Sequence, residues 1–172
     1  MSLKKVASGR RSVQTEVKVP GSTQTAAARR TAEAVVRTLI DKYVPAHLRL
    51  IAAMRRLLRK RLPTACEVVY AYHNLGAVVI SFSPSEQGFE GVLAIRASAD
   101  GVKLYFNQGK ALPDPEKLLQ GSAQARWIDV ADASTLARPA VTSLIDEAIA
   151  RNRVPFAPAG RGSVIIRPAK AK

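Results

Sequence analysis

The sequence predicts a single α+β domain, an antiparallel sheet of about five strands flanked by helices, and three observations lead to this prediction. The chain has 172 residues, 47% of them apolar, which suffices for one domain with its own core. Amphipathic helical patterns stand near both ends of the chain, with strand-like runs between them. Links of hairpin length join most of these runs, and such links connect antiparallel neighbours. Helices segregated from a run of antiparallel strands are typical of α+β proteins.

Two N-terminal helices are expected first. Residues 31–44 place apolar side chains at three- and four-residue spacing, with charged side chains on the other side. Pro45 ends this helix and suits the first position of the next one, where a missing N–H costs nothing. Residues 46–62 form an apolar stripe opposite a basic face, and Pro63 stops the second helix.

Five strands are expected where β-branched and aromatic residues gather between turn residues. Asn74 and Gly76 separate the first two runs, and the favoured hairpin pair Asp100-Gly101 separates the third and fourth. The five runs are residues 65–72, 77–83, 89–97, 102–107 and 125–130.

A short helix is expected before the last strand, over residues 112–121. Asp114 is its expected cap, Pro115 its first residue and Gly121 its end.

A C-terminal helix is expected to run from a cap at Ser134 or Thr135 to about residue 152, because its apolar residues share one face. Prolines and glycines after it predict a loop. Residues 163–167, SVIIR, are either a short strand or a docking segment, and five residues do not decide between them.

The formal net charge of +14 is unevenly distributed. Residues 1–30 hold seven basic residues and one acid, and residues 151–172 hold six basic residues and no acid. Residues 31–61 hold eight basic and two acidic residues, whereas residues 62–150 hold six basic and ten acidic ones. The basicity therefore belongs to the two ends and to the first two helices.

Three regions follow from this distribution and from the patterns. We expect a basic, disordered tail over residues 1–30 and the α+β domain over residues 31–152. A second basic tail, rich in proline and glycine, is expected over residues 153–172.

The charge predicts a polyanion as partner, most simply DNA or RNA bound without sequence specificity, because lysine and arginine displace condensed counterions from phosphates. The strongest local cluster is the end of the second helix. Its cations also suit the negative end of the helix dipole, so a merely solvated helix end is the alternative interpretation. The predicted polyanion-binding residues are Arg55, Arg56, Arg59, Lys60 and Arg61.

No motif nominates an enzyme, since the sequence lacks the phosphate-binding loops and the nucleophile elbow. Cys66, on a predicted strand beside Glu67, is expected to be a small buried residue rather than a nucleophile served by His47 or His73. No resident cofactor or metal is expected. No apolar run approaches the roughly 18–20 residues of a membrane span and no secretory signal follows the basic start, which predicts a cytoplasmic protein without a membrane partner.

Residues 32–151 resemble the YdhG-like domain, a small bacterial α+β module of largely unknown function. The family's proline, then glutamate and tyrosine entering the first strand, stand here as Pro63, Glu67 and Tyr70. The more specific match is residues 101–130, GVKLYFNQGKALPDPEKLLQGSAQARWIDV, which contain the family's aromatic strand end, leucine, Asp-Pro, Leu-Leu, glycine and strand-opening arginine. These residues are Phe106, Leu112, Asp114, Pro115, Leu118, Leu119, Gly121 and Arg126.

The resemblance implies the α+β fold, and it brings in iron handling because some relatives have been proposed as frataxin-like iron chaperones. Gly101 stands where many members have a histidine, and residues 122–124 lack the lysine that often follows the short helix. No ligand role is therefore carried over to these positions.

A small-ligand pocket is the remaining expectation, because a sheet covered by helices often leaves a pocket on one face. Tyr70, Lys103, Tyr105 and Arg126 come from different strands and are predicted to line it, with two cations that suit a small anion. The sequence thus leaves two functions open. One is a non-enzymatic binding module whose tails and second helix contact a polyanion. The other is a small-ligand or iron-binding chaperone whose tails serve only solubility.

Overall fold

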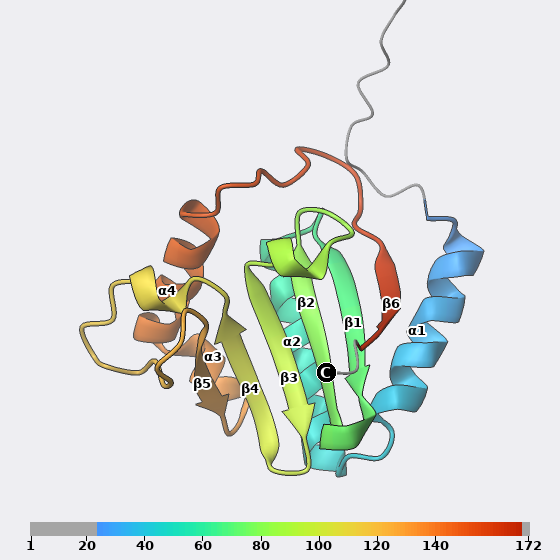
Figure 1. The fold of residues 1–172 in the computed structure, drawn as a ribbon, viewed down its shortest axis with the longest axis horizontal. Coiled ribbons are helices and arrows are strands. Elements are labelled where there is room, and N and C mark those ends of the chain that lie inside the picture. The colour runs from blue at the N-terminus through green and yellow to red at the C-terminus, as the bar shows by residue number, and fades with distance from the viewer. Residues whose placement is uncertain (1–23, 170–172) are drawn as a thin grey trace, which may run out of the picture.

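The computed structural model describes residues 24–169, in which helices cover one face of a six-stranded mixed sheet (Figure 1). The helices are α1 (Ala26–Ile40), α2 (Pro45–Arg61), α3 (Ala133–Ala137) and α4 (Pro139–Ala150). The strands are β1 (Cys66–Tyr72), β2 (Ala77–Ser83), β3 (Leu93–Ser98), β4 (Gly101–Phe106), β5 (Arg126–Val130) and β6 (Val164–Pro168). Three single-turn 3-10 helices are η1 (His73–Leu75), η2 (Gly88–Glu90) and η3 (Gly109–Ala111). The predicted α+β class is confirmed.

The sheet has the order β5-β4-β3-β2-β1-β6. Strands β1 to β5 form an antiparallel meander, as the hairpin-length links predict. The sixth strand, β6, lies parallel to β1 at the edge of the sheet. The prediction of a purely antiparallel sheet of about five strands was therefore wrong in strand number and in direction.

The segment 163–167, which the sequence left undecided, enters the sheet through local backbone contacts. The N–H of Glu67 donates to the carbonyl oxygen of Ser163 at 2.8 Å. The side-chain amide of Gln24 bonds both backbone groups of Val164, accepting from its N–H at 2.9 Å and donating to its carbonyl at 2.8 Å. A Cβ on Gly162 would overlap the carbonyl of Ala65, so only glycine allows this close entry to the edge of β1.

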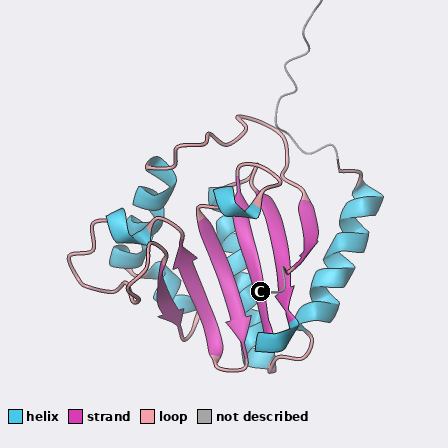
Figure 2. Ribbon diagram, viewed as in Figure 1, coloured by secondary structure: helices cyan, strands magenta, loops and turns pink. Residues whose placement is uncertain are grey.

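One face of the sheet is buried under helices. Helix α2 packs against β3 and β4, and α1 packs against β6. The period-2 alternation of β3 shows the result, because Leu93, Ile95 and Ala97 are buried in the core. The largest fully buried apolar side chains are Val36, Ile51, Met54, Leu58, Ile80, Phe82, Leu93, Ile95, Leu104, Phe106 and Ile145. Figure 2 shows the strands in front of the helices, with the opposite face of the sheet toward the reader.

The short helix predicted over residues 112–121 does not form. The Asp114 carboxylate does accept backbone N–H groups, those of Leu118 at 2.9 Å and Leu119 at 2.8 Å, but these lie four and five residues on, beyond the second and third helical residues that a helix cap serves. Lys117 also has φ 53°, a left-handed conformation that a right-handed helix cannot include. The segment is a turn, so the prediction of a helix here was wrong.

The helix ends also differ from the predicted ones. Helix α1 begins at Ala26, capped by the Thr25 hydroxyl, which accepts the N–H of Ala28 at 3.1 Å. Residues 24–30 thus belong to the domain, and the rest of the predicted N-terminal tail lies outside the described residues. The C-terminal helix is divided into α3 and α4, because Pro139 cannot continue α3, and Asp132 rather than Ser134 caps the first part. None of the helices within residues 24–169 is long and apolar enough to cross a membrane.

Candidate functional site: the open face of the sheet

The face of the sheet opposite α2 (Figure 1), called the open face from here on, carries aromatic and charged side chains from several strands. Cross-strand partners share a face, so the register assigns its members directly. One row across the sheet reads Arg167, Tyr70, Val79, Arg96, Lys103 and Asp129, and the next reads Ile165, Val68, Ser81, Ala94, Tyr105 and Trp127. Tyr72 lies one row further along β1.

A shallow hollow of about 250 Å³ lies on this face. It is lined by Tyr72, Leu75, Val79, Ala94, Arg96, Tyr105 and Asn107. Val79 and Ala94, on the two central strands, are the small members of this set, while Tyr72 and Tyr105 come from β1 and β4 on either side. The arrangement therefore offers two aromatic walls over an apolar floor.

Arg96 is the charged member of the hollow. It is half-buried in the middle of the sheet, and within residues 24–169 its guanidinium makes no hydrogen bond or ion pair. A guanidinium presents five N–H donors in a planar fork that matches a carboxylate or phosphate. Arg96 is therefore a ready anion-binding group between two aromatic rings.

Tyr105 is held in place from behind. Its ring stacks on Trp127 with centroids 5.5 Å apart and planes at 26°. Lys103 Nζ lies 5.2 Å from the centroid of the Trp127 ring and 3.4 Å from a carboxylate oxygen of Asp129. Gly121, at φ 103°, lies so close to the indole that a Cβ there would overlap it. The stack on Trp127, which Lys103 and Gly121 contact in turn, restricts the rotation of the Tyr105 ring at the side of the hollow.

The pocket set predicted from the sequence is only partly assembled. Tyr70, Lys103 and Tyr105 share the open face, but Arg126 pairs with the core-facing Phe106 and points the other way. Its guanidinium donates to the carbonyl oxygens of Ala123 and Gly121 in the preceding loop. Tyr70 and Lys103 are three strands apart, about 14 Å at normal strand spacing. Of the four residues, only Tyr105 lines the hollow.

Three of the five predicted polyanion-binding residues of α2 are engaged in ion pairs. Arg55 and Arg59 both contact Glu33 of α1 and Glu67 of β1, and Arg61 contacts Asp146 of α4. Arg56 and Lys60 are exposed. Within residues 24–169, the basic end of α2 therefore presents two of the five predicted cations without an ion pair.

The four residues Glu33, Arg55, Arg59 and Glu67 form a partly buried ion-pair network between α1, α2 and β1. The Arg55 Nε lies 2.7 Å from a Glu67 oxygen, and the Glu67 side chain is only 2% exposed. Burial disfavours the charge of Glu33, but Arg55 and Arg59 outweigh it and hold the pKa of this carboxyl below its ordinary value. The network joins α1 and α2 to the sheet. It engages Arg55 and Arg59, which the sequence analysis predicted to bind a polyanion.

The described residues assemble no nucleophile and base of the kind considered from the sequence. Cys66 is buried at the start of β1, where burial raises the pKa of its thiol in spite of hydrogen bonding to Ser163. His73 follows the other end of the same strand, about 20 Å away at the rise of an extended chain. Within residues 24–169, no group of three or more His, Cys, Asp or Glu side chains is placed to hold a metal ion.

Sequence reasoning missed Arg96, the residue on which the hollow depends. The sequence did contain an indication of this residue. Arg96 stands between Ile95 and Ala97, which point to the other, apolar side of the same predicted strand. An arginine at the centre of such a strand has to emerge on a face that no helix covers. Which aromatic rings stand beside it is decided by strand order, which the local pattern does not contain.

Comparisons with known proteins add no relative to this description: the chain matches no protein-family model, no curated protein and no solved structure. The YdhG-like resemblance thus remains a proposal based on the motifs quoted above.

Proposed function

We propose that this protein is a non-enzymatic binding module that holds single-stranded nucleic acid on the open face of its sheet. The observation that supports this most is Arg96, which is half-buried, makes no hydrogen bond or ion pair within residues 24–169, and lines one hollow with Tyr72 and Tyr105. Proteins that bind single strands combine aromatic side chains, on which bases stack, with cations that follow the phosphates. The hollow contains both groups on one rigid sheet.

The size of the hollow favours one unit of a chain over a free metabolite. Pockets for small molecules usually enclose about 300–1,000 Å³, and this hollow is smaller, at about 250 Å³. It lies on the sheet face opposite α2, part of which is covered by η2, since Gly88 lies against the Tyr70 ring and its carbonyl oxygen accepts from the Ser81 hydroxyl. A base that enters it still leaves its sugar and phosphates outside, where they continue along the sheet. A double helix keeps its bases stacked inside and cannot use the tyrosine walls.

The charges of the open face agree with a polyanion that crosses the strands. Within the strands, its charged residues are Arg96, Lys103 and Arg167 against Asp129 alone. Asp129 already contacts Lys103 at 3.4 Å and accepts from the Gln120 amide at 2.8 Å. The face therefore keeps an excess of positive charge in the row that contains Arg96.

This proposal changes the role given to the second helix. Arg55, Arg59 and Arg61 serve internal ion pairs, and the exposed Arg56 and Lys60 lie on α2, on the other side of the sheet from the open face, so a strand bound there does not depend on them. The predicted contribution of the N-terminal basic residues is a separate proposal, because residues 1–23 lie outside the described part of the chain. Small-ligand or iron-binding chaperone function is the alternative, and iron handling depends on the family resemblance alone.

The test is a fluorescence-anisotropy titration of the full chain with a labelled oligothymidylate of about 15 nucleotides, near the upper site size of a single-strand-binding domain. Tyr105→Ala should weaken binding about fivefold or more, the scale of one lost base–aromatic stack. Arg96→Gln should weaken it and flatten the dependence on salt between about 50 and 200 mM. Trp127, the only tryptophan, stacks on Tyr105 and should change its emission when a base binds.

Two controls separate the open face from general basicity. Arg49→Gln removes an exposed cation of α2 and should leave affinity nearly unchanged. An abasic oligonucleotide keeps the phosphates but offers nothing to stack, so it should bind the wild-type chain and Tyr105→Ala equally weakly. Equal binding of the abasic and normal strands, or full affinity of Arg96→Gln together with Tyr105→Ala, would refute the proposal.

A further inference from the structure

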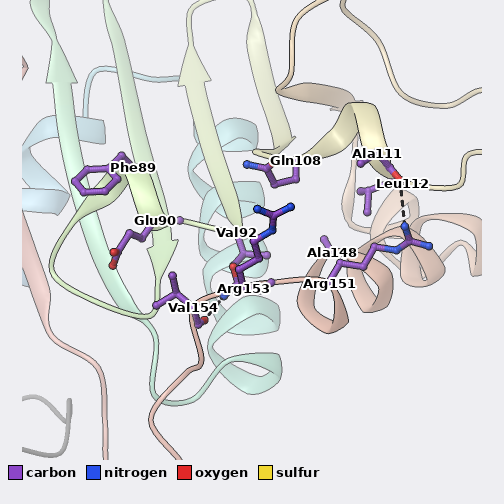
Figure 3. Close-up of a pocket in the computed structure, with 12 residues that line it drawn as sticks. Phe89, Glu90, Val92, Gln108, Ala111, Leu112, Ala148, Arg151, Arg153 and Val154 are labelled. Atoms are coloured by element: carbon purple, nitrogen blue, oxygen red, sulfur yellow. Dashed lines mark hydrogen bonds between the residues drawn. The ribbon is translucent and has the colours of Figure 1, made fainter.

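A second and larger hollow lies at one end of the sheet (Figure 3). It adjoins the open-face hollow, because Asn107 of that hollow donates to the carbonyl oxygen of Gly91, which lines the larger one. Its volume is about 580 Å³, within the range of about 300–1,000 Å³ that is usual for small-molecule pockets. Three segments surround it: η2 with the start of β3, η3 with its flanks, and the end of α4 with the loop after it. It shares no lining residue with the open-face hollow.

The hollow has an apolar lining with two apolar side chains at its mouth. Val92, Leu112 and Ala148 are buried at its base. Phe89 is 80% exposed and Val154 is 37% exposed, although both line the hollow. Aromatic side chains gain the most from burial, so an exposed phenylalanine beside an open pocket marks a surface that a ligand can cover.

The charged side chains that line the hollow differ in how many hydrogen bonds and ion pairs they already make within the protein. Arg151 contacts Glu147 at 2.7 Å and donates to the carbonyl oxygen of Ala111 at 3.3 Å. Glu90 accepts a hydrogen bond from the Ser85 hydroxyl. Arg153 makes no hydrogen bond or ion pair within residues 24–169, and Figure 3 shows its guanidinium extending into the hollow toward Gln108. Among the described residues that line the hollow, Arg153 is thus the cation without a hydrogen bond or ion pair.

Gln108 completes the polar end. Its side-chain oxygen accepts from Gln124, which leaves its NH₂ group as a donor beside Arg153. Donors without an acceptor therefore meet at one end of the hollow, while Glu90 stands near Phe89 at the other (Figure 3). An acid at that second end disfavours a second negative charge on the ligand.

We propose that this hollow binds a small organic monoanion with an aromatic or apolar body. Its carboxylate, sulfonate or phosphodiester group lies against Arg153 and the Gln108 amide, and its body covers Val92 and reaches Phe89. The guanidinium supplies a charge-assisted, bidentate contact, and the apolar lining supplies the area that the ligand removes from water. This site goes beyond the proposed function, because it uses other residues and another class of ligand.

The test uses 8-anilino-1-naphthalenesulfonate, an aromatic monoanion whose fluorescence rises on burial, titrated into the full chain. One saturable site is expected. Arg153→Gln should weaken the affinity about tenfold or more, the scale of a lost charge-assisted hydrogen bond. Phe89→Ser should weaken it about tenfold or more as well, the scale of an apolar side chain that is no longer covered. Arg49→Gln is the matched control and should bind like the wild type. N-phenyl-1-naphthylamine lacks the sulfonate, so it should not distinguish Arg153→Gln from the wild type.

The outcome is independent of the open-face proposal. Arg96→Gln and added oligothymidylate should leave the affinity for the dye unchanged, whichever way the nucleic-acid experiment turns out. Absence of a saturable site overturns the inference, as does full affinity in either Arg153→Gln or Phe89→Ser. Displacement of the dye by oligothymidylate would also overturn it, because the dye would then lie on the open face. Tighter binding of a short peptide with a C-terminal phenylalanine than of the dye would overturn the assignment to a small organic anion and indicate a peptide partner instead.

Discussion

Replacing Glu67 by glutamine should destabilise this protein more than any other single change of one charge in the ion-pair network. Glu67 lies on the core-facing side of β1 and is 2% exposed, with a guanidinium on each carboxylate oxygen. Glutamine keeps the volume of the side chain, so the substitution removes the charge without opening a cavity. Arg55, itself only 12% exposed, would then share Glu33 with Arg59 as the remaining acid of the network.

The magnitude follows from burial. Removing one partner of a buried ion pair costs about 3–5 kcal/mol, because the other charge stays buried without compensation. For a domain of this size, about 1 kcal/mol shifts Tm by 2–4 °C, so the expected fall in Tm is about 6–20 °C. Total stabilities of about 5–15 kcal/mol make this a large share of the free energy of unfolding.

Glu33→Gln is the matched control, since it removes the second acid of the same network. The Glu33 side chain is 25% exposed, and water screens part of what it contributes, so its loss should cost between about 1 and 3 kcal/mol. Urea unfolding followed by circular dichroism gives both values. If Glu67→Gln lies within about 1 kcal/mol of the wild type, or costs no more than Glu33→Gln, the argument from burial fails. A double-mutant cycle with Arg55→Met should show coupling of about 0.5–3 kcal/mol.

Two further predictions concern titration and backbone conformation. Because the pKa of Glu33 is lower in the folded protein than in the unfolded chain, its contribution to stability is present at neutral pH and is lost as pH falls through the folded value. Glu33→Gln should therefore reduce the loss of stability on acidification below about pH 4.5, and an unchanged acid limb of the stability profile would contradict this. Gly121→Ala should cost about 1–3 kcal/mol, because a Cβ at φ 103° would overlap the Trp127 ring. Gly76→Ala, at φ 57° with nothing within 4 Å, should cost about 1–2 kcal/mol, and thermal unfolding that ranks Gly76→Ala as the more costly change would contradict the overlap argument.

The sequence predicted those parts of the fold that neighbouring residues determine. The strands β1 and β2 begin and end within a residue of their predicted limits, because turn residues bound them on both sides. The error over residues 112–121 has a local cause. An aspartate favours both turns and helix starts, so its presence does not distinguish the two; here Asp114 accepts the N–H groups of Leu118 and Leu119, four and five residues on, instead of those of a first helical turn.

What the sequence could not give depends on elements that meet across the fold. Arg55 and Arg59 are four residues apart and share a helix face, yet their acids come from α1 and β1. From the sequence alone, these arginines of α2 are therefore expected to be available to a polyanion, whereas in the structure they form ion pairs within the domain. In the same way, Tyr72 and Tyr105 become two walls of one hollow through the order of the strands between them.

The parallel strand β6 has a consequence for the order in which this chain can fold. Its partner β1 ends at Tyr72, whereas β6 begins only at Val164, so the two meet late in synthesis and close a long loop. Until then β1 is an edge strand with unpaired backbone groups, next to the apolar run of β2. Of the six strands described, β6 is thus the last to be synthesised, and it covers the edge of β1 when it pairs. The interval before β6 arrives is when self-association through β1 is the greatest hazard.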